Sequence, residues 1–231
     1  MHSTRVEFIR HRDAAEKNAR RLASKLLLLA TPLVLTSCIS YAVGTTARPI
    51  PEGTFQPNLS VYFVPNGIED VSDDGSPDDS LAYGSADFEG RWGLSDRSDL
   101  GLRVPAGSGA IVNYKRLLSR VNDPDRMAVA AMGGAGIVNF GNHFYVEGTL
   151  IASGREGDRV PYGGIRAMHV LPLSSGAVSD TPTVGVFGGL RMRTASNFSL
   201  SPELGIYRDE PALGLREGNF IFIPSVSFHW D

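Results

Sequence analysis

The sequence predicts an all-β chain that folds as an antiparallel β-barrel of about ten strands. From about Gly53 onward, no segment keeps an apolar period of about 3.6 residues for three turns, so amphipathic helices are not expected. Apolar and polar residues instead alternate along most segments, which is typical of strands with two different faces. Short polar turns separate these segments, as in a meander of antiparallel strands.

The predicted strands lie near residues 53–64, 80–94, 98–105, 109–118, 127–138, 143–154, 160–171, 182–193, 197–208 and 218–230. In the last strand, the even-numbered residues from Phe220 to Trp230 are all apolar. In the second, Asp87, Glu89 and Arg91 lie opposite a face of apolar or small residues. The alternation is weakest in the fifth and seventh strands. An even number of strands returns both ends of the chain to the same side.

Strand length and loop length favour a barrel that crosses a membrane. Most of the predicted strands are 10 to 13 residues long, which is enough for a tilted transmembrane strand of about 9 to 11 residues. The turns on the side of the chain ends are short, whereas three opposite connections are long: 65–79, 173–181 and 208–218. Bacterial outer-membrane barrels usually have short periplasmic turns and longer outer loops. We therefore expect an antiparallel transmembrane β-barrel, preceded by a cleaved signal segment.

A soluble β-sandwich alternates in the same way, so a second argument is needed. Glycine occurs in most of the predicted strands, although it weakens strands in general. Aromatic residues near strand ends predict the interfacial girdles of a membrane barrel. These residues are Tyr62, Phe63, Trp92, Tyr114, Phe144, Tyr145, Tyr207, Phe228 and Trp230.

Charged residues within the strands are expected to face the lumen. They are Asp87, Glu89, Arg91, Arg103, Lys115, Glu147, Arg166, Arg191 and Glu203. Such a set can line a pore and determine its selectivity. It can also pair and fill the lumen, because an eight-stranded barrel is already filled by its side chains and ten strands add little room. The nearly balanced signs favour a plugged or very narrow lumen, because unpaired charges in such a lumen are costly.

The amino terminus predicts export. Several Arg and Lys residues precede the apolar run Leu26–Leu35, which is about half as long as a membrane-spanning helix. Leu35-Thr36-Ser37-Cys38 resembles the bacterial lipobox, which implies a signal peptide over residues 1–37 and lipid attachment at Cys38, the only cysteine. The alternative is ordinary cleavage after Ala42, because Ser40-Tyr41-Ala42 fits the small-x-small rule. With cleavage before Cys38, residues 38–52 are a short linker, and residues 53–231 form the barrel domain in either case.

Three segments resemble bacterial outer-membrane β-barrel proteins. The ending Ser227-Phe228-His229-Trp230 resembles their carboxy-terminal signal, although Asp231 follows where the aromatic residue is normally last. The segments 90–104 and 200–207 resemble strand-turn segments that recur in the same class. This resemblance implies a small porin-like barrel in the outer membrane, in contact with lipid and lipopolysaccharide. It also implies that the barrel-assembly machinery recognises Phe228 and Trp230.

The sequence shows no pattern that identifies a substrate. A formal charge of −3 and a pI of about 6.0 argue against nucleic-acid binding. The histidines lack metal-ligand spacing, residues 133–141 fit no phosphate-loop pattern, and the acidic segment 69–80 lacks the order of an EF-hand. We expect no catalytic residues, cofactor or metal, and a structural role or a narrow channel for small solutes.

Two other functions are compatible with the sequence. One is a periplasmic or surface lipoprotein whose soluble β-sandwich binds a ligand or partner protein. The other is a barrel-embedded lipid-modifying enzyme that uses His229 with a nearby serine.

Overall fold

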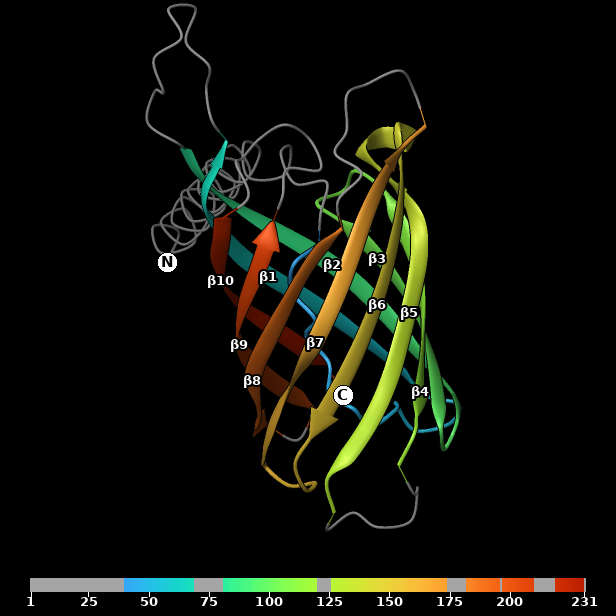
Figure 1. Ribbon diagram of the computed structural model, residues 1–231. Helices are drawn as coiled ribbons and strands as arrows, with labels where there is room; N and C mark the ends of the chain where they lie inside the picture. The colour runs from blue at the N-terminus through green and yellow to red at the C-terminus, as the bar shows by residue number, and fades with distance from the viewer. Residues whose placement is uncertain are drawn as a thin grey trace, which may run out of the picture.

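The computed structural model describes residues 40–68, 81–119, 126–173, 182–195, 197–209 and 219–230. These residues form ten antiparallel strands that close into one barrel, with each strand paired to its neighbours in the sequence and β1 paired to β10 (Figure 1). The predicted signal segment, Cys38, the acidic segment 69–80 and Asp231 lie outside the described residues.

The strands are β1 (Phe55–Ile68), β2 (Leu81–Ser95), β3 (Ser98–Pro105), β4 (Ala110–Leu117), β5 (Ala128–Val138), β6 (His143–Ser153), β7 (Arg159–Pro172), β8 (Thr183–Ala195), β9 (Phe198–Asp209) and β10 (Asn219–Trp230). A short 3-10 turn, η2 (Asn139–Gly141), joins β5 to β6. Every predicted strand is confirmed, with its ends displaced by only a few residues. No helix among the described residues is long and apolar enough to cross a membrane.

The barrel is closed by its first and last strands. Asn58 pairs with His229, and the register continues to Tyr62 opposite Ser225. This pairing confirms the predicted antiparallel barrel and excludes the β-sandwich, which keeps two open sheets face to face. The start of β1 and the end of β10 define what we call the terminus end of the barrel. The opposite end, with the connections β1–β2, β3–β4, β5–β6, β7–β8 and β9–β10, is the loop end.

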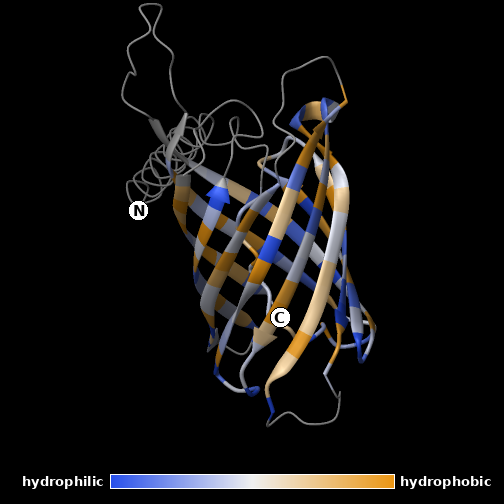
Figure 2. Ribbon diagram, viewed as in Figure 1, coloured by the Kyte–Doolittle hydropathy of each residue, from blue (hydrophilic) through white to orange (hydrophobic). Residues whose placement is uncertain are grey.

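Alternation gives the barrel an apolar outer face. The large apolar residues Leu150, Ile165 and Val186 are partners in neighbouring strands, and each has about half of its surface exposed. The row continues through Ile206 to Phe222 on β10. Hydrophobic and hydrophilic residues alternate along most of the strands (Figure 2). The apolar side chains that a soluble protein would bury therefore lie on the outside of this barrel.

On the outer face of the described strands, the side chains of Arg, Lys, His, Asp and Glu lie only near strand ends. These residues are Arg116, Arg159, His169 and Arg208. The middle of the outer wall consequently forms a charge-free band around the barrel.

The predicted aromatic girdles are only partly present. Phe63, Trp92, Tyr114 and Trp230 are exposed on the outer face, each by 40% or more. The prediction was wrong for Tyr62, Tyr145 and Tyr207, which are buried in the barrel interior. Each of these tyrosines lies an even number of residues from an inward-facing polar residue of its own strand. Position along the strand therefore mattered less than the face on which the side chain lies.

Candidate functional site

The lumen of the barrel is occupied by the chain's own amino-terminal segment, residues 40–50, which we call the plug (Figure 1). Ser40 and Ala47 are fully buried, and every residue between them is buried as well. Ile50 lies beside Asp99 at the terminus end, whereas Ser40 lies beside Asp87, about halfway along β2. The plug thus runs down the lumen and joins β1 through residues 51–54. Residues 40–50 of the expected linker therefore lie in the barrel, whereas Pro51 and Glu52 are exposed.

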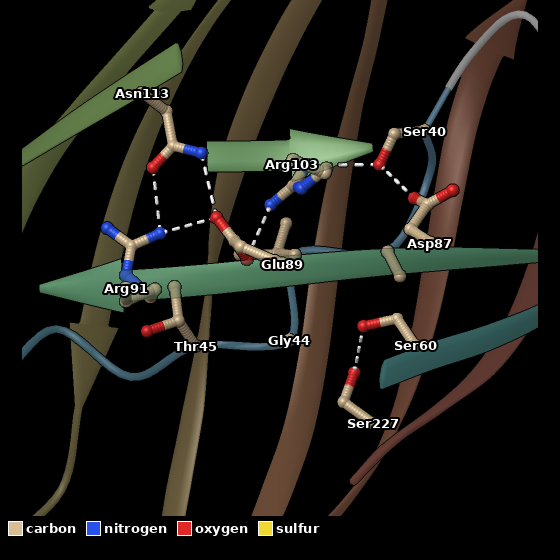
Figure 3. A network of polar contacts seen from close by, with 12 residues as sticks. Ser40, Gly44, Thr45, Ser60, Asp87, Glu89, Arg91, Arg103, Asn113 and Ser227 are labelled. Carbon is tan, nitrogen blue, oxygen red and sulfur yellow. Dashed lines mark hydrogen bonds and ion pairs between the residues drawn. The ribbon is translucent and has the colours of Figure 1, made fainter. Parts of the chain in front are cut away.

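The plug fits because its side chains are small. A barrel of eight strands has an interior just wide enough for its own side chains. The expectation that ten strands add little room was wrong, because the lumen also holds one extended chain segment. Residues 42–47 of that segment are Ala, Val, Gly, Thr, Thr and Ala. Gly44 has a positive φ of 60° and lies against Ser60 and Ser227, which are hydrogen-bonded to each other across the β1–β10 seam (Figure 3). A larger residue at this position would collide with the wall.

Cations of the wall bind the carbonyl oxygens of the plug. The Arg166 guanidinium donates to the carbonyl oxygens of Tyr41 and Ala42, at 3.0 and 3.2 Å. Lys115 Nζ donates to the carbonyl oxygens of Thr46 and Arg48, both at 3.0 Å, and to Thr45 Oγ1 at 2.9 Å. The plug belongs to no β-ladder, so these contacts replace the hydrogen bonds that a strand would supply.

Anions of the wall bind the N–H groups of the plug. The Glu203 carboxylate accepts hydrogen bonds from the backbone N–H groups of Val43 and Gly44, at 2.9 and 3.1 Å. Asp99 Oδ2 accepts the N–H of Ile50 at 2.9 Å. Hydrogen bonds to charged groups each contribute about 1.5 to 3 kcal/mol. The wall therefore binds mainly the main chain of the plug, with charges matched to its donors and acceptors.

The end of the plug nearest the loop end, which we call its upper end, is Ser40 to Ala42. It is bound through side chains as well. Ser40 Oγ donates to Asp87 and accepts a hydrogen bond from Arg103 Nη1 at 3.0 Å (Figure 3). The Tyr41 ring makes edge contacts with Tyr62 and Tyr207, at ring-centre distances of 6.1 and 5.4 Å. Tyr207 Oη also donates to the carbonyl oxygen of Tyr41 at 2.8 Å.

Seven charged residues of the wall form one chain of ion pairs with alternating sign. Along it, each acid is bonded to a cation on either side, in the order Lys115, Asp99, Arg91, Glu89, Arg103, Glu147, Arg166. Asn113 bridges the Arg91 and Glu89 side chains with two hydrogen bonds of 2.7 Å (Figure 3). Removing one member of a buried ion pair costs about 3 to 5 kcal/mol, because the other charge is left unpaired. The network therefore holds the inner wall in one arrangement.

Two apolar clusters lie in the interior, one on each side of this ion-pair network. Toward the loop end, Tyr41 packs with interior residues that include Val64, Met168, Val170 and Ile223. Toward the terminus end, Val43 and Ala47 pack with residues that include Leu117, Ile151, Tyr162 and Phe187. The lumen is filled at both levels, so the structure is that of a closed barrel.

Eight of the nine charged residues predicted to face the lumen are buried inside the barrel; the ninth, Arg191, is partly exposed. With Arg193 and with Arg48 of the plug, Arg191 lines a cavity of about 440 Å³ beside residues 46–50, at the terminus end. The predicted assembly residues Phe228 and Trp230 lie on the outer face, where both rings contact Phe198. Cys38 lies outside the described residues.

Sequence reasoning missed Asp99 and the plug itself. Asp99 is fully buried, and its alternation with Arg103 in β3 could have identified it as an inward residue. Tyr162, which donates to Glu203 at 3.0 Å, was missed because alternation is weak in β7. The plug residues show no periodicity and no charge before Arg48, so no sequence signal placed them inside.

The chemistry that the interior can perform is limited. Ser201 Oγ and His229 Nε2 lie 2.9 Å apart, but both residues are only 1% exposed. A substrate in lipid or water has no access to this pair. Among the described residues, no three His, Cys, Asp or Glu side chains are grouped so that they could hold a metal ion.

No protein-family model matches the chain, and no curated protein matches it. Similar solved structures include Neisserial surface protein A, with 11% identity over 76% of this chain and 96% of that one and a TM-score of 0.38. An outer membrane channel from Pseudomonas putida F1 has 12% identity over 83% and 99%, with a TM-score of 0.48. The outer membrane protein OprG from Pseudomonas aeruginosa has 10% identity over 80% and 99%, with a TM-score of 0.33. At identities this low, no function is transferred from these proteins to this chain.

Proposed function

We propose that this protein is an outer-membrane β-barrel that its own plug keeps closed to solutes, and that its role is structural rather than catalytic. The observation that carries the proposal is the reversed sidedness of the barrel. Its large apolar residues face out, and its buried charges face in.

The outer face supports a lipid environment. Among the described residues, 22 large apolar side chains are at least 37% exposed, including Phe88, Ile165, Phe220 and Phe222. Soluble monomers rarely expose contiguous apolar patches larger than a few hundred Å². Every transmembrane barrel needs closure of its sheet, because lipid cannot satisfy an open strand edge. Here the closure is complete and the middle of the outer wall carries no charge.

The filled lumen supports a closed barrel. Ion pairs, hydrogen bonds to the plug and two apolar clusters bury all the plug residues from Ser40 to Ala47. Solute passage would require the plug to leave the lumen.

A gated channel is the second candidate, and one observation favours it. Residues 40–50 pair with no strand, so the plug can withdraw without breaking the ladder of the barrel. Withdrawal would break the hydrogen bonds of Arg166, Glu203 and Lys115 to the main chain of the plug.

Single-channel recording in planar bilayers tests the closed barrel. We expect the intact protein to show no conductance steps. A variant in which residues 40–50 are replaced by a Gly/Ser segment of the same length should conduct, because that segment cannot supply Tyr41, Val43 and Ile50 to the interior. Regular steps from the intact protein at low voltage would contradict the closed state, and steps confined to high voltage would favour the gated channel. If the replacement variant stayed silent, the wall side chains alone would close the lumen.

A further inference from the structure

Cleavage by an ordinary signal peptidase after Ala42 would remove three plug residues that the wall of the lumen contacts. The sequence offers cleavage before Cys38 or after Ala42, and the second would discard Ser40, Tyr41 and Ala42. These residues are 0%, 3% and 2% exposed in the folded barrel.

Four wall residues direct polar groups at this short segment. Arg166 donates to the carbonyl oxygens of Tyr41 and Ala42, and Tyr207 donates to the first of these. Ser40 Oγ joins Arg103 to Asp87. Asp87 belongs to none of the ion pairs found among the described residues, and its other hydrogen-bond donor is Tyr62 Oη at 3.3 Å. Ser40 is thus its closer hydrogen-bond partner.

The Tyr41 ring fills the space between Tyr62 and Tyr207 and belongs to the upper apolar cluster. A chain that began at Val43 would leave this space empty among buried tyrosines, and the lining would lose its packing contacts. Such a chain would gain one contact, since its terminal ammonium group would lie at the Glu203 carboxylate, where the Val43 N–H now lies at 2.9 Å. One new ion pair does not replace the lost partners of Asp87, Arg103, Arg166 and Tyr207.

We propose that the precursor is cleaved upstream of Ser40, and that Ser40, Tyr41 and Ala42 remain in the mature protein as the upper end of the plug. This rests on the proposed outer-membrane location, because only an exported precursor meets a signal peptidase. The small-x-small motif ending at Ala42 is then part of the folded structure rather than a cleavage signal.

Mass spectrometry of the protein purified from outer membranes tests the proposal. We expect a mature chain whose first residue is Ser40 or a residue before it, and proteolytic peptides that contain the sequence Ser40-Tyr41-Ala42-Val43. A chain that begins at Val43, or an uncleaved chain in the outer membrane, would overturn the cleavage proposal and leave the outer-membrane location intact. An uncleaved chain recovered from the cytoplasm would overturn both.

A second measurement asks whether the barrel needs these residues. An unrelated signal peptide with a defined cleavage site is fused directly before Ser40 in one gene and directly before Val43 in another. On a denaturing gel, a folded barrel that has not been boiled migrates faster than the unfolded chain. We expect the chain from Val43 to lose this faster band at a temperature several degrees lower than the chain from Ser40. Equal resistance of the two chains to heating would overturn the structural role of residues 40–42.

Discussion

At the scale of single residues, the plug depends on the position at which it passes closest to the wall. Gly44 has a φ of 60°, a conformation that costs a residue with a Cβ about 1 kcal/mol or more. A Cβ added there would lie 2.5 Å from Ser227 Oγ and 2.9 Å from Ser60 Oγ. The close approach and the backbone conformation both require glycine.

Gly44→Ala is expected to destabilise the plug by about 1 to 3 kcal/mol, through left-handed strain and collision with the β1–β10 seam. The measurement is the temperature at which the folded band is lost on a gel. Gly148→Ala is the matched control, because a Cβ at Gly148 meets nothing within 4 Å. An equal response of the two variants would show that the plug does not lie against the seam in solution.

Cys38 carries the prediction of lipid attachment. Its thiol is the only one in the chain, and a thioether to the lipid cannot form on serine. Cys38→Ser should therefore abolish incorporation of labelled palmitate, with the amount of barrel followed by immunoblot. Labelling that persists in the variant would remove the lipobox interpretation.

At the scale of elements, each strand presents one face to the interior and one to the outside. On β7, Ile165 is 53% exposed, whereas the next residue, Arg166, is 1% exposed and binds the plug. We therefore expect the outer face to require apolar side chains and the inner face to require charged ones. A charge introduced on the outer face tests this expectation.

Ile165→Arg is expected to destabilise the barrel in a bilayer by about 2 to 4 kcal/mol, because the charge would lie near the middle of the lipid-facing wall. A water-soluble barrel would tolerate the same change at an exposed site. Urea titration of the protein folded into vesicles measures the difference. Asn142→Arg, at an exposed turn of the loop end, is the control. A neutral Ile165→Arg would contradict the membrane assignment.

The end of β10 carries the predicted assembly signal. Trp230 is 42% exposed and contacts Phe198 at 5.9 Å between ring centres. We expect Trp230→Ala to reduce the folded fraction in outer membranes several-fold, because the assembly machinery would lose its aromatic anchor. Phe220→Ala is the matched control, since Phe220 lies on the same face near the other end of the strand and is 69% exposed. Equal losses would indicate a general need for apolar surface rather than a carboxy-terminal signal.

At the scale of the whole molecule, closure and the internal ion network predict a barrel that resists denaturation. Its sheet has no open edge, and β1 and β10 are joined by a continuous register. We expect the unheated protein to migrate faster in a denaturing gel than the boiled protein, and to remain in the membrane after carbonate extraction. Release by carbonate, with a single band in both samples, would exclude a membrane barrel.

Ten strands and their two faces could be predicted from the sequence because each depends on local order. Side chains of a strand alternate with a period of two, so Phe220 and Phe222 had to share a face, as did Glu89 and Arg91. Once the apolar face of each strand was assigned to lipid, the polar face had to point into the barrel. The same alternation also places Asp99, Tyr62, Tyr145 and Tyr207 on the inner face, where they are buried. The aromatic-girdle argument wrongly placed the three tyrosines on the outer face.

The plug was decided by the tertiary structure alone. Residues 40–50 have no periodicity, and the wall groups that bind them come from strands far along the chain: Asp99, Lys115, Arg166 and Glu203. Local sequence determines which face a side chain takes. The closed ring determines how wide the interior is, and this width, with charges brought together from β3, β4, β7 and β9, decides that the chain's own small residues fill it.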